Sequence, residues 1–530
     1  MKLFRAVLIF CAAVLFPSVS FSQQPGPVSL IPRPGELRLG GGWMRLSIGS
    51  PIIVTESTRQ VGEYLAAFLE RASGSQIEVR ELSGGQGEHA QWDVDADIGS
   101  VVLSVDPQLE SLGPEGYRMS IDSNTVRITA HTSDGVFYGC QSLRQLLPPT
   151  AETGSVRHAG WTIPQMQIVD KPRFNWRGLM VDCSRTFQSV EYLRKLIDLL
   201  ALYKMNILHL HLTDDQGWRI QIDRYPELTK VGAVYPERYH QSGGFYTKEQ
   251  IRDLLKYAQE RRVTLVPEIE MPGHCLAALA AYPELSCKGG PFETFPFFKE
   301  DGIQTDVFCA GDEAVFTFLQ NVLDEVIELF PSRYIHVGGD EVRKIRWKNC
   351  PKCQARIKKE GLRNENELQS YFIRRIENYL NSRGRNLIGW DEILEGGLPP
   401  RATVMSWRGM EGGIKAASMG HDVVMSPTSH CYLDYEHSRI PVELAYSFEP
   451  GPQGLTPEQS RHVLGLQGNI WTHIAVNEPS VDRQIFPRLI ALAEVAWTEP
   501  DRKNWNDFNA RLGRHFSRLS ELGVNYFSED

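Results

Sequence analysis

The sequence predicts an α/β fold, in which a (β/α)8 TIM barrel follows a smaller α+β domain. Two observations support this prediction. From Phe174 onward, short apolar segments alternate with helical patterns eight times, which is typical of parallel βα units. Before that point, short alternating segments surround two helical stretches, as in a mixed sheet with helices. We therefore expect a leader at 1–22, an α+β domain at 23–172 and the barrel at 173–530.

The first 22 residues have the features of a secretory signal peptide. Lys2 and Arg5 precede an apolar run over 6–16, and Ser20 to Ser22 form a small-x-small cleavage pattern. The apolar run is too short to span a bilayer as a mature anchor. We expect an exported chain, periplasmic or extracellular, with no membrane span after processing.

In the N-terminal domain, strands are expected at 101–105 and 126–129, because apolar and polar residues alternate there. An amphipathic helix is expected over 59–71. A second helix begins near Asp134-Gly135 and ends before Pro148-Pro149, since proline cannot continue it. A last extended segment over 161–172 leads into the barrel.

The barrel strands are short apolar segments, and longer helical patterns separate most of them. The expected strands are 178–182, 207–212, 264–269, 334–337, 387–390, 403–406, 422–425 and 464–471. The expected helices are 190–204, 248–260, 313–330, 365–382 and 412–419, with 483–496 closing the ring.

Composition and charge narrow the function classes. The chain is 42% hydrophobic and 23% charged, which matches a folded globular protein. Lys plus Arg number 56 against 65 Asp plus Glu, a net charge of -9, and no long basic run is present. Nucleic acid is therefore not an expected partner.

Eight of the nine cysteines lie outside the leader, and an oxidising destination would permit disulfides among them. Cys287 and Cys309 bracket a segment rich in Gly, Pro and Phe, where a bridge would staple a long loop. Cys350 and Cys353 form Cys-Pro-Lys-Cys, which is compatible with redox chemistry or with half of a zinc site. Because no second Cys or His pair follows at zinc spacing, we interpret these cysteines as structural.

Acidic and aromatic residues follow the predicted strands, at the barrel end where active sites form. Carboxylates with several tryptophans suit a glycosidase, since sugar rings present apolar faces and rims of hydroxyls. The sharpest motif runs from His336 to Glu341, where an apolar strand ends in Gly338-Gly339-Asp340-Glu341. Adjacent acids repel, so one can stay ionised while the pKa of its neighbour rises toward that of a general acid.

These motifs resemble those of glycoside hydrolase family 20, the β-N-acetylhexosaminidases. The resemblance covers nearly the whole mature length. Four motifs occur in the family's order, one per strand: Arg177 to Asp182, His209 to Asp215, Pro267 to His274, and His336 to Glu341.

The resemblance implies an exo-acting, retaining hydrolase in which the substrate's own 2-acetamido oxygen attacks the anomeric carbon. Glu341 would be the general acid and then the base. Asp340 would hold the acetamido N–H and stabilise the oxazolinium-like intermediate. The implied partner is a glycan or glycoconjugate with a terminal β-linked N-acetylglucosamine or N-acetylgalactosamine, and no cofactor or metal is implied.

The resemblance also assigns the other site residues. Trp390, Trp407 and Trp471 match the wall around the acetamido group, while Arg177 and Asp214 match residues that bind outer hydroxyls. Tyr432 and Asp434 match the pair for the acetamido carbonyl and the 4/6-hydroxyl rim. Three further residues are expected to orient the catalytic pair or to lie at the rim: His274, His336 and Glu270.

One departure concerns substrate detail. The family usually has Trp-Thr-Glu after the last strand, where this chain has Trp471-Thr472-His473. Loss of that anion removes a charge-assisted hydrogen bond to the 4-hydroxyl and a repulsive wall against negative substituents. We expect tolerance of both gluco and galacto sugars or of a 6-sulfated sugar, unless Glu449 or Glu478 replaces the missing acid.

Two rival functions remain at this point. His209-x-His211 at a strand end favours a metal-dependent amidohydrolase, but the later strands end in Trp390-Asp391-Glu392 and Trp407-Arg408 rather than in further ligands. The other rival is a non-catalytic glycan-binding barrel. The presence of both Asp340 and Glu341 argues against it.

Overall fold

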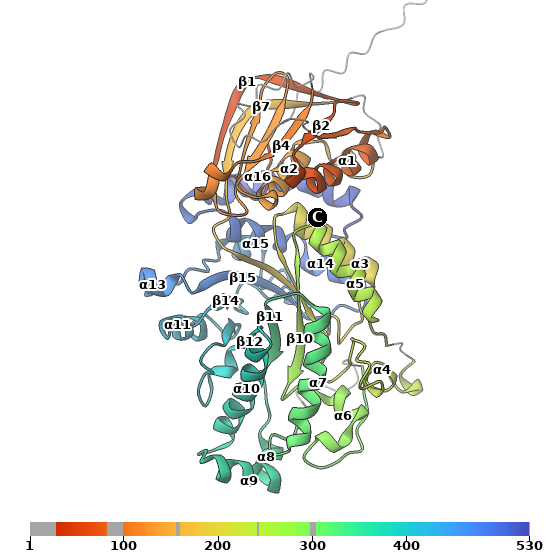
Figure 1. The fold of residues 1–530 in the computed structure, drawn as a ribbon, viewed down its shortest axis with the longest axis vertical. Coiled ribbons are helices and arrows are strands. Elements are labelled where there is room, and N and C mark those ends of the chain that lie inside the picture. Colours follow the sequence, from red (N-terminus) through yellow and green to blue (C-terminus); the bar gives the residue numbers. More distant parts are fainter. Residues whose placement is uncertain (1–27, 82–98, 155–159, 241–242, 297–303, 529–530) are drawn as a thin grey trace, which may run out of the picture.

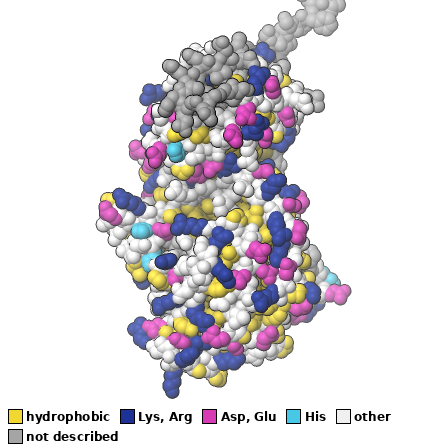
Figure 2. All heavy atoms as spheres, in the orientation of Figure 1, with side chains coloured by type: hydrophobic (Ala, Val, Ile, Leu, Met, Phe, Trp, Pro, Cys, Tyr) yellow, Lys and Arg dark blue, Asp and Glu magenta, His cyan; other side chains and the backbone are white. Residues whose placement is uncertain are grey.

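The computed structural model describes residues 28–81, 99–154, 160–240, 243–296 and 304–528, and the predicted signal peptide lies outside them. It has a small sheet domain stacked on one end of a barrel (Figure 1). Figure 2 shows positive and negative side chains interspersed over one face of the molecule. Among the described residues, no helix has the length and apolar character needed to cross a membrane.

The small domain is built on one mixed sheet of seven strands. Two helices, α1 (Arg59–Ser73) and α2 (Ser133–Leu146), pack on the sheet (Figure 1). Helix α2 also contacts the barrel helix α3 (Val190–Leu202). Both predicted helices and both predicted strands are present. The strand order is β1 (Glu36–Ser47), β7 (Gly160–Asp170), β5 (Tyr117–Ile121), β6 (Val126–Ala130), β4 (Val101–Val105), β2 (Ile52–Val54) and β3 (Val79–Glu81).

The second part is a closed barrel in which all neighbouring strands are parallel. Each of the eight predicted strands matches an observed one to within two residues at either end. They are β8 (Trp176–Asp182), β9 (Ile207–His211), β10 (Thr264–Met271), β11 (Tyr334–Gly338), β12 (Asn386–Trp390), β13 (Thr403–Ser406), β14 (Val423–Met425) and β15 (Val463–Ile470).

One set of helices surrounds the barrel, and another lies in its loops. The surrounding helices that match predicted ones are α3 (Val190–Leu202), α5 (Lys248–Glu260), α7 (Glu313–Leu329), α10 (Glu365–Ser382) and α11 (Glu411–Ser418). The helices in the loops are α4 (Glu227–Lys230), α6 (Leu276–Ala281), α8 (Ile345–Asn349), α9 (Pro351–Glu360), α12 (Val442–Ser447) and α13 (Pro457–Ser460).

The prediction of one helix over 483–496 was wrong. The segment contains the end of α14 (Glu478–Ile485) and most of α15 (Arg488–Trp497), with Phe486 extended between them. Pro487 explains the break, because proline lacks the N–H that an unbroken helix needs and restricts the residue before it. A further helix, α16 (Trp505–Glu521), was not predicted.

Buried ion pairs join the small domain to the barrel. Glu152 pairs with Arg144 of α2 and with Arg518 of α16. Asp170 at the end of β7 accepts hydrogen bonds from Lys204 Nζ at 2.8 Å and from Trp497 Nε1 at 2.8 Å. These contacts hold the sheet domain against the amino-terminal end of the barrel and leave the opposite end free to form a site.

Candidate active site

A pocket of about 310 Å³ opens at the carboxyl ends of the barrel strands. Its size fits one sugar ring better than a chain, since ligand pockets usually range from about 300 to 1,000 Å³. Nine of the predicted site residues line it: His274, Asp340, Glu341, Trp390, Trp407, Tyr432, Asp434, Trp471 and His473. A larger groove lies at the other end of the barrel, but none of these nine residues lines it.

The backbone at the carboxylate pair is held in an unusual conformation. Gly338 and Gly339 have φ of 67° and 89°, and Glu341 has φ of 47°, which is rare for a residue with a side chain. A Cβ on Gly338 would lie 1.6 Å from Glu270 Oε2, so only glycine allows the strand to pass this close. Strain of this kind typically persists where function requires it.

Asp340 is buried, whereas Glu341 reaches the pocket with a side chain that is 34% exposed. Burial raises the pKa of Asp340, and the charges of Glu268 and Glu341 raise it further against the opposing effect of His274. Asp340 Oδ1 accepts no hydrogen bond from any described residue. This oxygen is therefore available to a ligand. The upward pKa shift that we expected for one of the two acids falls on Asp340.

His274 touches both carboxylates. Its Nε2 lies 3.4 Å from Asp340 Oδ2 and 3.4 Å from Glu341 Oε2, while its Nδ1 lies 3.2 Å from Asp214 Oδ1. Burial opposes a charge on this ring, but Asp214 and Asp340 together raise its pKa well above the ordinary value. His274 therefore joins the carboxylate pair to the residues behind it. Its backbone has a positive φ of 46°.

Behind His274 lies a chain of buried acids and imidazoles. His211 donates from Nε2 to Asp214 at 2.8 Å and from Nδ1 to Glu268 at 2.5 Å. Burial alone would lower the pKa of His211, but these two acids raise it to about 10. Glu268 also contacts His336 Nδ1 at 2.7 Å, and His336 is not among the residues that line the pocket.

The tryptophans form a fixed wall because each has a specific partner. Trp390 Nε1 donates to Glu268 at 2.9 Å, and Trp407 Nε1 donates to Glu392 at 2.8 Å. The rings of Trp390 and Trp471 lie 5.9 Å apart, and Trp407 stacks on Tyr432 at 6.0 Å. The wall is rigid and apolar, which suits a small group that must be held in one orientation.

Glu270 lies behind Asp340 rather than in the pocket. It is 1% exposed, and neither carboxyl oxygen has a hydrogen-bond partner among the described residues. Burial and the charges of Asp340 and Glu268 raise its pKa well above the ordinary value.

Two predicted contacts with the sugar were wrong. The Arg177 guanidinium is buried at the amino-terminal end of β8, where it pairs with Glu115 at 2.8 Å and donates to the carbonyls of Lys204 and Phe174. A side chain there cannot reach a pocket at the opposite strand ends. Asp214 is 1% exposed, and both of its carboxyl oxygens contact other side chains, those of His211, His274 and Arg185. It therefore positions pocket residues instead of binding sugar.

The residue in the place expected of Arg177 is Arg185, which the sequence analysis missed. It lines the pocket, pairs with Asp214 at 2.7 Å and lies over the Trp471 ring at 4.9 Å. The signal was its position, three residues after β8 ends at Asp182, where a loop side chain can turn back over the barrel mouth. Gln216 and Tyr435, which also line the pocket, were missed, and Asp215 was placed in a motif but given no role.

His473 lines the pocket together with Arg185 and Asp434. Burial and the nearby Arg185 charge lower its pKa, so the ring is neutral at pH 7. The two acids considered as replacements lie elsewhere: Glu449 pairs with Arg173 at 2.5 Å, and Glu478 accepts from the Ser189 N–H at 3.0 Å. Burial raises the pKa of Asp434 to about 7, and its Oδ1 has no partner among the described residues.

The imidazoles considered for a metal serve the hydrogen-bond network instead. Both nitrogens of His211 are engaged, Nδ1 with Glu268 at 2.5 Å and Nε2 with Asp214 at 2.8 Å. His209, on the same strand, is buried beside Glu268, and burial lowers its pKa to about 4.

Comparison with known proteins agrees with this geometry. A family model described as "Glycosyl hydrolase family 20, catalytic domain" matches residues 174–500, and one described as "Glycosyl hydrolase family 20, domain 2" matches residues 28–171. The chain belongs to glycosyl hydrolase family 20. The resemblance seen in the sequence motifs is thereby confirmed.

Relatives in this family share most of the chain. A protein of Porphyromonas gingivalis named Beta-hexosaminidase is 43% identical over 516 residues, which are 94% of this chain but 64% of that relative's length. The β-N-acetylhexosaminidase of Streptomyces coelicolor has a structure with a TM-score of 0.82 and 31% identity, covering 96% of this chain and 99% of its own. The Vibrio harveyi exo β-N-acetylglucosaminidase, solved with N-acetylglucosamine, has a TM-score of 0.82 and 31% identity, covering 94% and 78%.

Proposed function

We propose that this family 20 protein is an exo-acting, retaining β-N-acetylhexosaminidase that works by substrate-assisted catalysis. The observation that carries the proposal is the buried, unpartnered Oδ1 of Asp340 beside a tryptophan wall, with Glu341 next to it at the pocket. The substrate is a glycan or glycoconjugate that ends in a β-linked 2-acetamido sugar. We also propose, from the leader alone, that the chain is exported.

The acetamido group is the ligand that best matches this corner of the pocket. Its N–H donates to Asp340 Oδ1, and its methyl group packs against Trp390, Trp407 and Trp471. Confinement on three sides holds the carbonyl oxygen near the anomeric carbon, which converts attack into an intramolecular step. As positive charge develops on the five-membered ring, the carboxylate of Asp340 stabilises it in a pocket that excludes water.

Glu341 supplies the proton chemistry. Its carboxyl donates a proton to the leaving oxygen and then accepts one from the water that opens the intermediate. Asp340 and Glu341 both contact His274 Nε2, so they approach the sugar from one side. In an ordinary retaining pair the acid and the nucleophile flank the bond from opposite faces. The arrangement therefore favours the acetamido oxygen as nucleophile.

The residues on the far side of the pocket are consistent with removal of one sugar at a time from the end of a glycan. Arg185, Asp434 and His473 line it and offer polar atoms for the outer hydroxyls of a terminal sugar. A pocket of about 310 Å³ bounded in this way has room for one ring and none for a second beyond it.

Hydrolysis of p-nitrophenyl β-N-acetylglucosaminide, β-N-acetylgalactosaminide and β-glucoside by the purified chain tests the proposal. We expect turnover of the two acetamido substrates, a rate at least 100-fold lower on the glucoside, and the β-anomer as the first product in an NMR time course. Equal rates on the glucoside, or release of the α-anomer, would contradict substrate assistance.

A further inference from the structure

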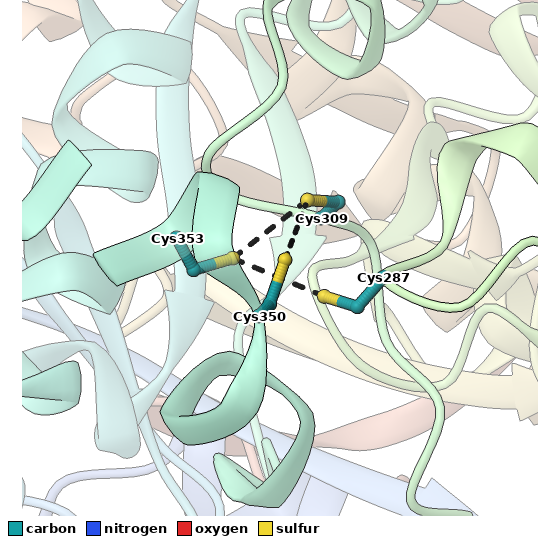
Figure 3. A group of neighbouring side chains, drawn as sticks. All are labelled: Cys287, Cys309, Cys350 and Cys353. Carbon is teal, nitrogen blue, oxygen red and sulfur yellow. Dashed lines mark hydrogen bonds between the residues drawn. The ribbon is translucent and has the colours of Figure 1, made fainter. Parts of the chain in front are cut away.

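Four cysteines from three separate segments converge outside the pocket (Figure 3). Cys287 follows the α6 region, Cys309 precedes α7, and Cys350 and Cys353 lie at the start of α9. The sulfur atoms of Cys287 and Cys353 are 3.8 Å apart, and those of Cys309 lie 3.7 Å from Cys350 and 3.7 Å from Cys353. All four sulfurs lie within 4.8 Å of one another.

These separations are those of a tetrahedron around one ion. Four thiolates that bind zinc at about 2.3 Å with tetrahedral geometry lie about 3.8 Å from each other. Two disulfides would instead divide the group into two pairs with sulfurs about 2.0 Å apart. Here Cys309 and Cys353 each contact two other cysteines, so the sulfurs surround a common point.

The surrounding backbone suits thiolates. Cys350 caps α9 and Cys353 lies in its first turn, where the helix N–H groups favour negative charge. A Cβ on Gly311 would lie 2.2 Å from the Lys352 carbonyl carbon, so glycine lets this loop lie against Cys-Pro-Lys-Cys.

We propose that Cys287, Cys309, Cys350 and Cys353 together bind one structural zinc ion. The four thiolates complete the coordination of zinc and leave no position for water or substrate, so the ion has no direct part in catalysis. The motif Cys350-x-x-Cys353 is one half of the site. The other half is Cys287 and Cys309, which precede it and are brought together only by the fold.

The ion would fix two segments that carry pocket residues. Next to Cys309, the Phe308 N–H donates to the Pro272 carbonyl at 3.0 Å, two residues before His274. The Phe308 carbonyl accepts from Trp347 Nε1 at 2.9 Å, in the segment that follows Glu341 and leads to Cys350. Zinc therefore ties the loop after β10 to the loop after β11.

Metal analysis of the full chain, purified without added metal or chelator, tests the site. Inductively coupled plasma mass spectrometry should find about one zinc per chain in the wild type. Cys353→Ser should lower the zinc content at least tenfold. Cys140→Ser, which changes an equally buried cysteine of α2 far from the cluster, should leave it unchanged and serves as the matched control.

Two measurements on the wild type keep the proposal testable if Cys353→Ser fails to fold. X-ray absorption at the zinc edge should show four sulfur ligands at about 2.3 Å. Alkylation of the denatured, unreduced chain should label all eight cysteines outside the leader. Less than 0.1 zinc per chain, bound iron in its place, nitrogen or oxygen ligands, or four cysteines protected as two disulfides would each overturn the proposal.

Discussion

The two ends of the barrel both bury charged residues, but the two sets differ in how far they are paired with opposite charges. At the amino-terminal end, beneath the small domain, Arg177 pairs with Glu115, Lys204 with Asp170, and Glu152 with Arg144 and Arg518. At the carboxyl end, Asp340, Asp434 and Glu270 each keep at least one oxygen without a partner among the described residues. Burial raises the pKa of all three.

The comparison distinguishes two kinds of buried charge: those that stabilise the fold, and those available to bind or transform a ligand. A buried pair whose members satisfy each other contributes to a defined interface, and losing one member leaves a costly unpaired charge. A buried acid without a partner is tolerated at some cost to stability, which is typical of sites that bind or transform a ligand. Substitutions at the two ends should therefore have opposite consequences.

The largest effects are expected at the carboxylate pair. Glu341→Gln should lower kcat by on the order of 10²- to 10⁴-fold on substrates with poor leaving groups, and far less on activated aryl glycosides, because it removes the proton donor. Asp340→Asn should lower kcat on both kinds of substrate by on the order of 10²- to 10³-fold, because it removes the charge that stabilises the intermediate.

Steady-state kinetics on a series of aryl N-acetylglucosaminides with different leaving-group pKa values measures both variants. The expected slope against leaving-group pKa is steep for Glu341→Gln and close to that of the wild type for Asp340→Asn. The reverse pattern would exchange the roles of the two acids.

The next largest effects are expected for two arginines, Arg185 at the carboxyl end of the barrel and Arg177 at its amino-terminal end. Arg185→Ala should lower kcat/KM about 10- to 100-fold through KM, because a charge-assisted hydrogen bond is worth about 1.5 to 3 kcal/mol. Arg177→Ala should lower the free energy of unfolding by about 3 kcal/mol, because it leaves the half-buried Glu115 without its cation, while the folded fraction keeps its kcat/KM. Denaturant unfolding and kinetics of both variants check this, and a raised KM in Arg177→Ala would contradict the contrast.

A smaller effect is expected on the pH dependence of stability. Burial and the charge of Asp340 raise the pKa of Glu392 to about 8. Because the native pKa is the higher one, the stability that the neutral carboxyl contributes is complete below about pH 4 and is lost as the pH rises to 8.

Glu392→Gln keeps an acceptor for Trp407 and removes the titration. We therefore expect the Tm of this variant to fall less than that of the wild type between pH 5 and pH 8, by several degrees. Parallel Tm curves for the two proteins in this range would show that Glu392 is already ionised in the native state.

The sequence located the strands and most of the site, because a barrel places every strand end at one mouth. Its failures have two causes: some sequence signals were not used, and some contacts are made only by the fold. Arg177 lies at the start of β8 and Arg185 follows its end, and the direction of the strand decides which of the two reaches the pocket.

Pro487 was a local signal for a helix break that we did not use. Helix α16, which was also not predicted, packs against a distant part of the chain. The four-cysteine cluster was missed because its halves lie in different loops.

The smallest expected effect concerns the outer hydroxyls. His473→Glu would place an anion beside Arg185 and Asp434, which should strengthen binding of an undecorated N-acetylglucosamine and repel a 6-sulfated one. We expect the ratio of kcat/KM for these two substrates to change by about tenfold. A strict preference for undecorated N-acetylglucosamine in both proteins would show that His473 does not set specificity.

The most direct test of substrate assistance is a series of aryl glycosides whose 2-acetamido methyl carries zero, one, two or three fluorine atoms. Fluorine withdraws electrons from the carbonyl oxygen and makes it a poorer nucleophile, while the change in size is small. The mechanism proposed for Asp340 and Glu341 predicts that kcat/KM of the wild type falls steeply with each added fluorine. A flat series would mean that another group attacks the anomeric carbon, which would contradict the mechanism.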